Sequence, residues 1–241
     1  LLDQLPDVEA VVVPVGGGGL ISGVAYAVKS LNPNVKVYGV QASGAPSMVN
    51  SLHDHKQEKL AKVSTIADGI AVKEPGSVTF DICSRYVDDI VTVSEDEICA
   101  AILHLIESEK MVAEGAGAAS VAAVMFNKVP VKGKKTICVV SGGNIDVTIL
   151  SRVINRGLAK SGRICTLIIE LADKPGQLLK VCQVIAAQGG NIVSVYHERN
   201  NDSKKVTDCV LRLSVETKNQ EHVESITKAL TDNGLKIREN I

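Results

Sequence analysis

The stretch that decides the fold is Ala-Val-Val-Val-Pro-Val-Gly-Gly-Gly-Gly-Leu at residues 10–20. From Val11 to Val15 the chain is apolar on both faces, which is typical of a strand buried inside a parallel sheet. The apolar spacing from Leu20 to Leu31 predicts a helix, and Val35 to Val40 predicts a second strand. A strand, a helix and a strand in this order predict a βαβ unit within an α/β domain.

The glycines Gly16, Gly17, Gly18 and Gly19 separate this strand from its helix. Glycine frees the backbone to wrap an anion, and the helix N-terminus supplies N–H donors. The run lacks the Gly-Lys-Ser/Thr ending of a Walker A loop, and Ser22 replaces the third glycine of a dinucleotide fingerprint. Two interpretations stay open, namely a cradle for a small monophosphate and a plain flexible turn.

A second glycine loop, Ser141-Gly142-Gly143-Asn144, follows a predicted strand at Thr136 to Val140. Ligands of open parallel sheets bind at the carboxyl ends of the strands. Two glycine loops at strand ends indicate a flat ligand that is held from both of its ends.

Two helices are expected between these loops. Ser94 and Glu97 form a capping-box pattern before a helix that carries Ile98, Ile102, Leu105 and Ile106. A further helix of small residues is expected through Ala118 to Phe126.

The pattern changes after about Ala159, and a βαββαβ order follows, which is that of a ferredoxin-like unit. We therefore expect one domain over residues 1–160 and another over 161–241, with the boundary near Ala159 to Gly162. The expected segments of the second domain are the strand Arg163 to Leu171, the turn Asp173 to Gly176, the helix Gln177 to Ala187, the turn Gly189 to Asn191, the strands Ile192 to Arg199 and Val206 to Val215 joined by Asn200 to Lys205, the helix Gln220 to Asp232 and the strand Leu235 to Arg238.

Composition limits the classes of function. The 241 residues are 45% hydrophobic and 22% charged with a net charge of -1, which suits a globular protein of one or two domains. Aromatic residues make up 2% and no dense Lys/Arg block occurs, so nucleic acid is not an expected partner. No apolar run approaches the roughly 20 residues that span a bilayer, so no membrane partner is expected.

The cysteines are scattered without a Cys-x-x-Cys pair, so we expect reduced, mostly buried thiols and a cytoplasmic location. They are Cys83, Cys99, Cys138, Cys165, Cys182 and Cys209. The chain opens Leu1-Leu2-Asp3 without Met and enters a predicted strand within a few residues. We therefore expect it to be a fragment of a longer protein.

Five stretches in order, from about Val8 to Leu150, resemble the threonine dehydratases (threonine ammonia-lyases), pyridoxal-phosphate enzymes of the tryptophan-synthase-β group. They are VGGGGLIS (15–22), TIADG (65–69), VDDIVTVSEDEI (87–98), EGAGA (114–118) and SGGNID (141–146). The resemblance implies a homo-oligomer with a tryptophan-synthase-β-like domain and pyridoxal 5'-phosphate as cofactor.

The resemblance also implies roles for individual residues. Gly16 to Gly19 and Leu20 would donate N–H groups to the cofactor phosphate, and the Ser141 hydroxyl would meet the pyridine nitrogen. Gly69 and Glu114 would lie near the ring. Each has a structural alternative: Ser141 as a helix N-cap, Gly69 as a turn residue and Glu114 as a surface carboxylate near a helix start.

The reaction implied by the resemblance is β-elimination of threonine or serine to 2-oxobutanoate or pyruvate with release of ammonia. Its Schiff-base lysine sits in a Ser-Phe-Lys-x-Arg-Gly-like context that no lysine of this chain has. Lys29, Lys36 and Lys110 are expected at ordinary helix or strand positions. We therefore expect no catalytic residue in this chain and no activity from this chain alone.

Some relatives of this group, such as serine racemase, hold a divalent cation with acids after the second strand. This chain has Gln41, Ala45 and Ser47 there, so no metal is expected.

The segments around Asp173-Lys174-Pro175-Gly176 and Gly189-Gly190-Asn191 resemble an ACT domain, a family that binds amino acids where two copies meet. The resemblance implies an effector site made by Gly176, Gln177, Leu178, Asn191 and Ile192. A plain helix start and a turn are the alternatives. His197 is expected to be structural or to face solvent.

The sequence is therefore consistent with two functions. One is an amino-acid ammonia-lyase regulated allosterically, with a coupling free energy on the order of 1–3 kcal/mol. The other is a non-catalytic fragment that only dimerises and binds an amino-acid effector. The sequence does not distinguish isoleucine biosynthesis from threonine breakdown.

Overall fold

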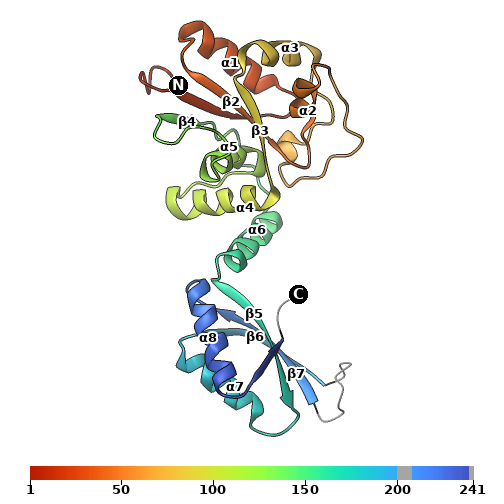
Figure 1. Cartoon of the computed structure of the whole chain (residues 1–241), viewed down its shortest axis with the longest axis vertical. Coiled ribbons are helices and arrows are strands. Elements are labelled where there is room, and N and C mark those ends of the chain that lie inside the picture. Colours follow the sequence, from red (N-terminus) through yellow and green to blue (C-terminus); the bar gives the residue numbers. More distant parts are fainter. Residues whose placement is uncertain (200–207, 239–241) are drawn as a thin grey trace. The chain divides into compact units, whose positions relative to one another are not determined.

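The computed structural model describes residues 1–199 and 208–238. The chain folds into two compact units, Leu1–Ile154 and Asn155–Ile241 (Figure 1). The predicted loop Asn200 to Lys205 and the start of the following predicted strand at Val206 lie outside the described residues.

The first unit contains a four-stranded sheet in the order β3-β2-β1-β4, and every pairing in it is parallel. The α/β expectation is confirmed. Its strands are β1 (Ala10–Pro14), β2 (Lys36–Ala42), β3 (Asp89–Val93) and β4 (Thr136–Cys138). Its helices are α1 (Gly19–Leu31), α2 (Ser47–His53), the 3-10 turn Asp68–Ile70, α3 (Ser77–Tyr86), α4 (Glu95–His104), the π-helical turn Leu105–Glu109, α5 (Gly115–Met125) and α6 (Val147–Lys160), the last of which runs into the second unit.

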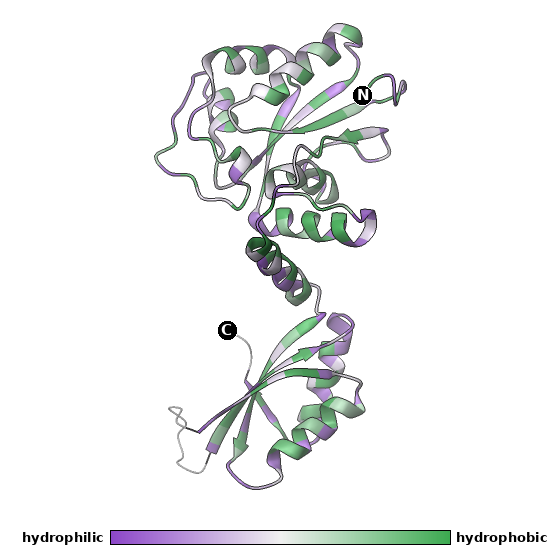
Figure 2. Ribbon diagram, turned by 180° about the vertical axis from the view of Figure 1, so that it is seen from behind, coloured by the Kyte–Doolittle hydropathy of each residue, from purple (hydrophilic) through white to green (hydrophobic). Residues whose placement is uncertain are grey.

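Side chains of β1 alternate between two apolar cores, one on each face of the sheet. Val12 belongs to the core that includes Ala118 of α5, whereas Val11 and Val13 belong to the core that includes Ile21 of α1. Every residue of β1 is buried. In Figure 2 the interior strands are correspondingly green. Helices on both faces are the reason that this strand is apolar throughout rather than alternating.

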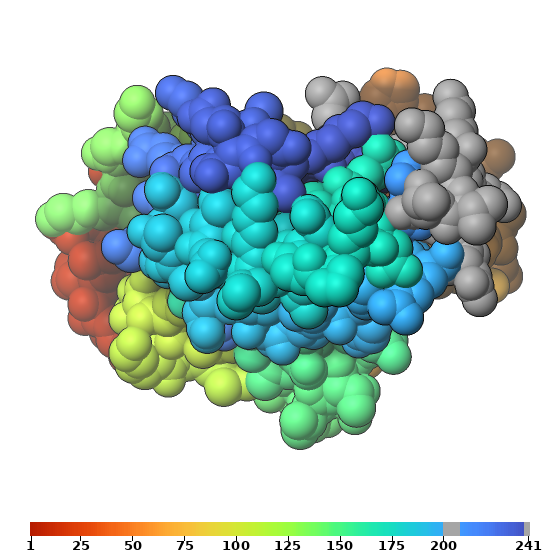
Figure 3. Space-filling model, turned by 90° about the horizontal axis from the view of Figure 1, so that it is seen from below, coloured from red at the N-terminus to blue at the C-terminus, as the bar shows by residue number. Residues whose placement is uncertain are grey.

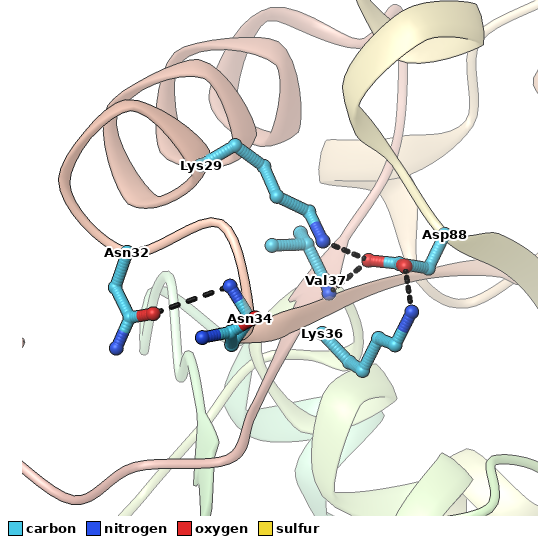
Figure 4. Close-up of polar contacts among 6 residues, drawn as sticks. All are labelled: Lys29, Asn32, Asn34, Lys36, Val37 and Asp88. Carbon is cyan, nitrogen blue, oxygen red and sulfur yellow. Dashed lines mark hydrogen bonds and ion pairs between the residues drawn. The ribbon is translucent and has the colours of Figure 1, made fainter.

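A charged cluster closes the amino-terminal edge of the sheet (Figure 4). The carboxylate of Asp88 lies 2.7 Å from Nζ of Lys29 and 2.8 Å from Nζ of Lys36, and it accepts a 2.8 Å hydrogen bond from the Val37 N–H. Burial raises the pKa of Asp88, but these donors together outweigh burial and hold that pKa below its usual value. Two of the three lysines considered from the sequence are thus engaged at the edge opposite the glycine loop.

The second unit is an antiparallel sheet in the order β6-β7-β5-β8, with two helices inserted in the βαββαβ sequence. This is the ferredoxin-like arrangement predicted from the sequence. Its elements are β5 (Ile164–Ala172), α7 (Gln177–Ala187), β6 (Asn191–Glu198), β7 (Asp208–Glu216), α8 (Gln220–Asp232) and β8 (Lys236–Arg238). Residues such as Ile169, Leu211, Ile185 and Ile226 form its core.

Three details differ from the sequence expectation. The strand expected to reach Val140 ends at Cys138. It is half-buried, because β4 is an edge strand with β1 as its one neighbour among the described residues. Lys110 is in neither a helix nor a strand, since it follows the π-helical turn with a left-handed φ of 57°. Helices α2 and α3 were not singled out from the sequence. The first is only seven residues long, and the second buries only Cys83.

The predicted capping box is confirmed. The Glu97 N–H donates to Oγ of Ser94, and the Ser94 N–H donates to the Glu97 carboxylate. Across the described ranges 1–199 and 208–238, no helix is long and apolar enough to cross a membrane.

Candidate active site

The glycine loop follows β1 at the carboxyl edge of the parallel sheet. Gly18 adopts a left-handed conformation with φ of 95° and is the N-cap of α1, where no side chain caps the helix. Within the described part of the chain, no acceptor is recorded for the backbone N–H groups from Gly16 to Ile21. A row of unpaired donors at a helix N-terminus is a ready site for an anion.

The carbonyl groups of the loop are held from one side. The carbonyl oxygen of Gly17 accepts from Oγ1 of Thr79 at 2.6 Å and from the Gly76 N–H at 3.2 Å, and the carbonyl oxygen of Gly16 accepts from Nε2 of Gln41 at 3.4 Å. In a trans peptide the N–H points opposite to the C=O. The N–H groups of Gly17 and Gly18 therefore face away from these anchors.

A side chain would be crowded at two of the glycines. A Cβ on Gly18 would lie 2.6 Å from Cε of Met48 and 2.9 Å from Oγ1 of Thr79. A Cβ on Gly16 would lie 3.2 Å from Cα of Ile70 and 3.4 Å from the carbonyl oxygen of Gly69. The loop therefore packs closely against the segment that contains Gly69, the next residue expected at the site.

Gly69, Glu114 and Gly142 converge beside this segment. A Cβ on Gly69 would lie 3.5 Å from Oε1 of Glu114, and a Cβ on Gly142 would overlap the same oxygen. Glu114 is the N-cap of α5, and its N–H donates to the carbonyl oxygen of Gly142 at 3.1 Å. The structure thus brings together four of the predicted segments: the glycine loop, residue 69, residue 114 and the loop after β4.

The remaining predicted cofactor residues lie next to these. Ser141 is exposed and adjoins Gly142, and Leu20 is exposed at the start of α1. Sequence reasoning missed the anchoring roles of Thr79 and Gln41. Thr79 carries no sequence signal, because it is 62 residues from the carbonyl that it binds.

A phosphate fits this arrangement, because the loop has free donors and glycines that admit close approach. Glycine at positions 16 to 19 leaves the backbone N–H donors open to such an anion.

Gln41 is one of the residues at the place where the resemblance leads us to expect no metal. It is fully buried, and its Oε1 accepts from the N–H groups of Met48 and Val49, both at 2.9 Å. Its amide therefore ties the end of β2 to α2 and to the glycine loop. The absence of a metal there stays a prediction.

The cysteines carry no disulfide among the described residues. Three are buried and three are half-buried, so the expectation of mostly buried thiols holds for half of them. Burial raises the pKa of the Cys83 and Cys138 thiols to about 11. Neither thiol is therefore an activated nucleophile.

The predicted effector residues of the second unit fall into two groups. Gly176 is the left-handed N-cap of α7, and Gly176, Gln177 and Leu178 line a pocket of about 440 Å³. The turquoise segment around the start of α7 lies at the surface of this unit (Figure 3). Asn191 lies at the start of β6, where its Nδ2 donates to Oε2 of Glu216 at 2.8 Å.

These two groups lie at opposite ends of the sheet. Leu171 pairs with Cys209, whereas Asn191 pairs with Glu216, seven residues further along β7. At about 3.3 Å per residue this separation is roughly 23 Å. One copy of the chain therefore cannot bring Gly176 and Asn191 to the same small ligand.

Comparison with known proteins identifies the family of each unit. Residues 1–143 match the family model described as pyridoxal-phosphate dependent enzyme, and residues 161–233 match the ACT domain model. Since the first match covers more than half of the chain, the chain belongs to the pyridoxal-phosphate dependent enzyme family. Its fold is the parallel-sheet domain of that family followed by an ACT domain.

Among curated relatives, the chain is 50% identical over 238 residues to the L-threonine ammonia-lyase of Thermotoga maritima, covering 99% of this chain and 59% of the relative. It is 42% identical over 230 residues to the L-threonine ammonia-lyase of Geobacter sulfurreducens, covering 95% of this chain and 57% of the relative. The chain thus spans less than two thirds of the length of these relatives.

Among solved structures, the processed threonine deaminase isoform 2 of Solanum lycopersicum is 40% identical with a TM-score of 0.61, covering 64% of this chain and 46% of that chain. The serine racemase of Dictyostelium discoideum is 36% identical with a TM-score of 0.56, covering 61% of this chain and 47% of that chain. Together with the curated relatives, these similarities do not favour the alternative of a purely regulatory fragment.

Proposed function

We propose that this chain forms the phosphate-binding and ring-facing part of a pyridoxal-phosphate dependent ammonia-lyase that acts on threonine. The observation that carries the proposal is the convergence of the glycine loop, Gly69, Glu114 and Gly142 at the carboxyl edge of the sheet. The names of the curated relatives support threonine over other amino acids.

In this proposal each residue of the site has a defined task. The N–H groups of Gly16 to Gly19 and of Leu20 bind the phosphate, and Thr79 and Gln41 hold the loop so that these donors face the ligand. The bound cofactor supplies an electron-withdrawing ring that stabilises negative charge next to the substrate amino group. Ser141 offers the ring nitrogen a neutral partner, which weakens this electron withdrawal and suits elimination. Glu114 contacts Gly142 and would lie beside the ring.

The lysine that bonds the cofactor is assigned to a position outside these 241 residues. Two observations support this. No lysine here has the sequence context that the family requires, and Lys29 and Lys36 are bound to Asp88 at the opposite edge of the sheet.

The second unit is assigned the binding of an amino-acid effector and allosteric regulation. Because Gly176 to Leu178 and Asn191 to Ile192 lie at opposite ends of one sheet, a shared ligand needs a second copy that pairs along the edge strand β6. A homo-oligomer follows from this requirement. Residues 1–160 and 161–241 are taken as the two domains, since α6 ends at Lys160. The absence of disulfides among the described cysteines supports a cytoplasmic location.

Cofactor binding can be tested on this chain by equilibrium dialysis against pyridoxal phosphate. We expect reversible binding that Gly18→Ala weakens at least about tenfold, equivalent to about 1.4 kcal/mol, because the added Cβ clashes with Met48 and Thr79. Gly23→Ala is the matched control. This glycine is exposed on α1, and a Cβ there meets nothing within 4 Å. Equal binding by both variants would contradict the cradle.

The reaction is tested separately on the product of the complete gene. We expect 2-oxobutanoate from threonine, and pyruvate from serine at a lower kcat/KM. Borohydride reduction should leave no cofactor bonded to a lysine among these 241 residues. A trapped cofactor on any of them would refute the assignment of the lysine, whereas dialysis alone decides the phosphate cradle.

A further inference from the structure

The pocket beside α7 contains a group of side chains that the proposed reaction does not use. Asp173, His197 and Cys209 all line it, and one ligand atom of each lies within 4.8 Å of the other two. They are a carboxylate oxygen, an imidazole nitrogen and a thiol sulfur. In sequence they are 24 and 12 residues apart, so no motif connects them.

The register of the sheet explains why they meet. Cys209 on β7 pairs with Leu171 on β5, and Asp173 follows Leu171 by two residues. His197 on β6 pairs with Leu211, so it is the diagonal neighbour of Cys209 on the same face of the sheet. This face carries the core of the unit, and Cys209 is 2% exposed.

The two carboxylate oxygens of Asp173 have different neighbours, and one of them lies on the side of His197. Oδ1 of Asp173 lies 3.9 Å from Nε2 of His197, whereas Oδ2 lies 3.2 Å from Nε of Arg199. Arg199 therefore pairs with Oδ2 of Asp173, and Oδ1 stays available on the side of His197. This resembles the way second-shell partners orient a ligating carboxylate.

We propose that Asp173, His197 and Cys209 form a binding site for a divalent transition-metal ion of the Zn²⁺ type. Calcium and magnesium prefer oxygen ligands alone, whereas a set of sulfur, nitrogen and oxygen suits Zn²⁺ and its neighbours in the first transition row. Tetrahedral zinc bonds of about 2.0–2.3 Å place ligand atoms roughly 3.4–3.7 Å apart, so the group needs to contract by about 1 Å.

Metal binding converts the Cys209 thiol to a thiolate, and the released proton passes to the buffer. Three protein ligands leave a fourth coordination position, which opens on the pocket. The site requires neither an amino-acid effector nor pyridoxal phosphate. Its test is therefore independent of the proposed function.

Titration with Co²⁺ as a coloured substitute for Zn²⁺ tests the proposal on this chain after treatment with a chelator. We expect one equivalent to bind with a thiolate-to-cobalt absorption band, and Zn²⁺ to displace it. Cys209→Ser should abolish the band, and Asp173→Asn and His197→Ala should each weaken binding by on the order of 100-fold.

Cys165→Ser is the matched control. Cys165 is on the same face of the sheet but pairs with Val215 near its other end, so its variant should bind as the unaltered chain does. The buried Cys209 variant could fail to fold. Asp173→Asn then still tests the site, because Asp173 is on an exposed loop where the substitution should not disturb folding. Binding that survives Asp173→Asn and His197→Ala, or that falls equally in Cys165→Ser, would overturn the proposal. So would the absence of saturable Co²⁺ binding.

Discussion

The backbone N–H of Glu114 donates a 3.1 Å hydrogen bond to the carbonyl oxygen of Gly142. The two residues are distant in sequence, yet the carboxylate of Glu114 also lies where a Gly142 side chain would have to be. This contact joins the start of α5 to the loop after β4, beside Gly69.

Replacing Gly142 with alanine should therefore displace the Glu114 carboxylate. We expect pyridoxal phosphate to bind this variant at least about tenfold more weakly, equivalent to about 1.4 kcal/mol. Glu114→Gln keeps the shape of the side chain and should retain most of the binding. If both variants bind alike in equilibrium dialysis, the position of this carboxylate does not matter to the site.

The Thr79 hydroxyl should matter to the site through the loop that it anchors. Thr79→Val removes the 2.6 Å hydrogen bond to the Gly17 carbonyl oxygen and should cost about 1 kcal/mol of unfolding free energy. Affinity for inorganic phosphate, measured by calorimetry, should fall as well. Ser84→Ala is the control on the same helix, because its exposed hydroxyl donates to the carbonyl oxygen of Asp81 and not to the glycine loop. Unchanged phosphate affinity in Thr79→Val would show that the hydroxyl does not order the donors.

Asp88 predicts a pH dependence of stability. Its carboxylate is mostly buried with the Lys29 ammonium, and Asp88→Asn should cost about 1–3 kcal/mol at neutral pH. Since its pKa is lowered by folding, this stability is present above the ordinary carboxyl pKa and is lost as the pH falls toward the lower folded value.

Urea unfolding at several pH values from 7 down to 3 measures this effect. The difference between the unaltered chain and Asp88→Asn should shrink toward acid pH. Asp81→Asn serves as a control, because its ion pair with Arg85 is exposed and should contribute less than about 0.5 kcal/mol. A difference that stays constant with pH would mean that the Asp88 charge does not stabilise the fold.

If two copies of the chain pair along the edge strand β6, oligomer formation and effector binding should be lost together. Val193 is exposed on β6 at an irregularity of the register, and Val193→Lys should shift the protein toward the monomer in analytical ultracentrifugation. Calorimetry with isoleucine, valine, threonine and serine should show heat for at least one of them, and this heat should be lost in the same variant.

Val78→Lys on α3 is the control, because it adds the same charge at an exposed valine of the first unit. No heat from any of the four amino acids would leave the second unit as a dimerisation element. Heat that persists in a monomeric Val193→Lys protein would contradict an effector site shared between two copies.

Local patterns account for the parts of the fold that the sequence predicts. The buried strand β1, the glycine run, the Ser94 capping box and the turn before α7 each depend on neighbouring residues, so a short window of sequence contains the information. The resemblance to a known family depends on five motifs in a fixed order, which no short window of sequence contains. The family match supports that resemblance.

The sequence by itself determined that a glycine loop precedes a helix and that a βαββαβ unit follows an α/β unit. Both properties come from backbone freedom and from hydrophobic periodicity along the chain. The tertiary structure decided that Thr79 and Gln41 turn the loop's carbonyls away from the site, that Glu114 meets Gly142, and that Asp173, His197 and Cys209 converge. Sheet register and helix packing create these contacts between distant residues, and neither can be read from a spacing in the sequence.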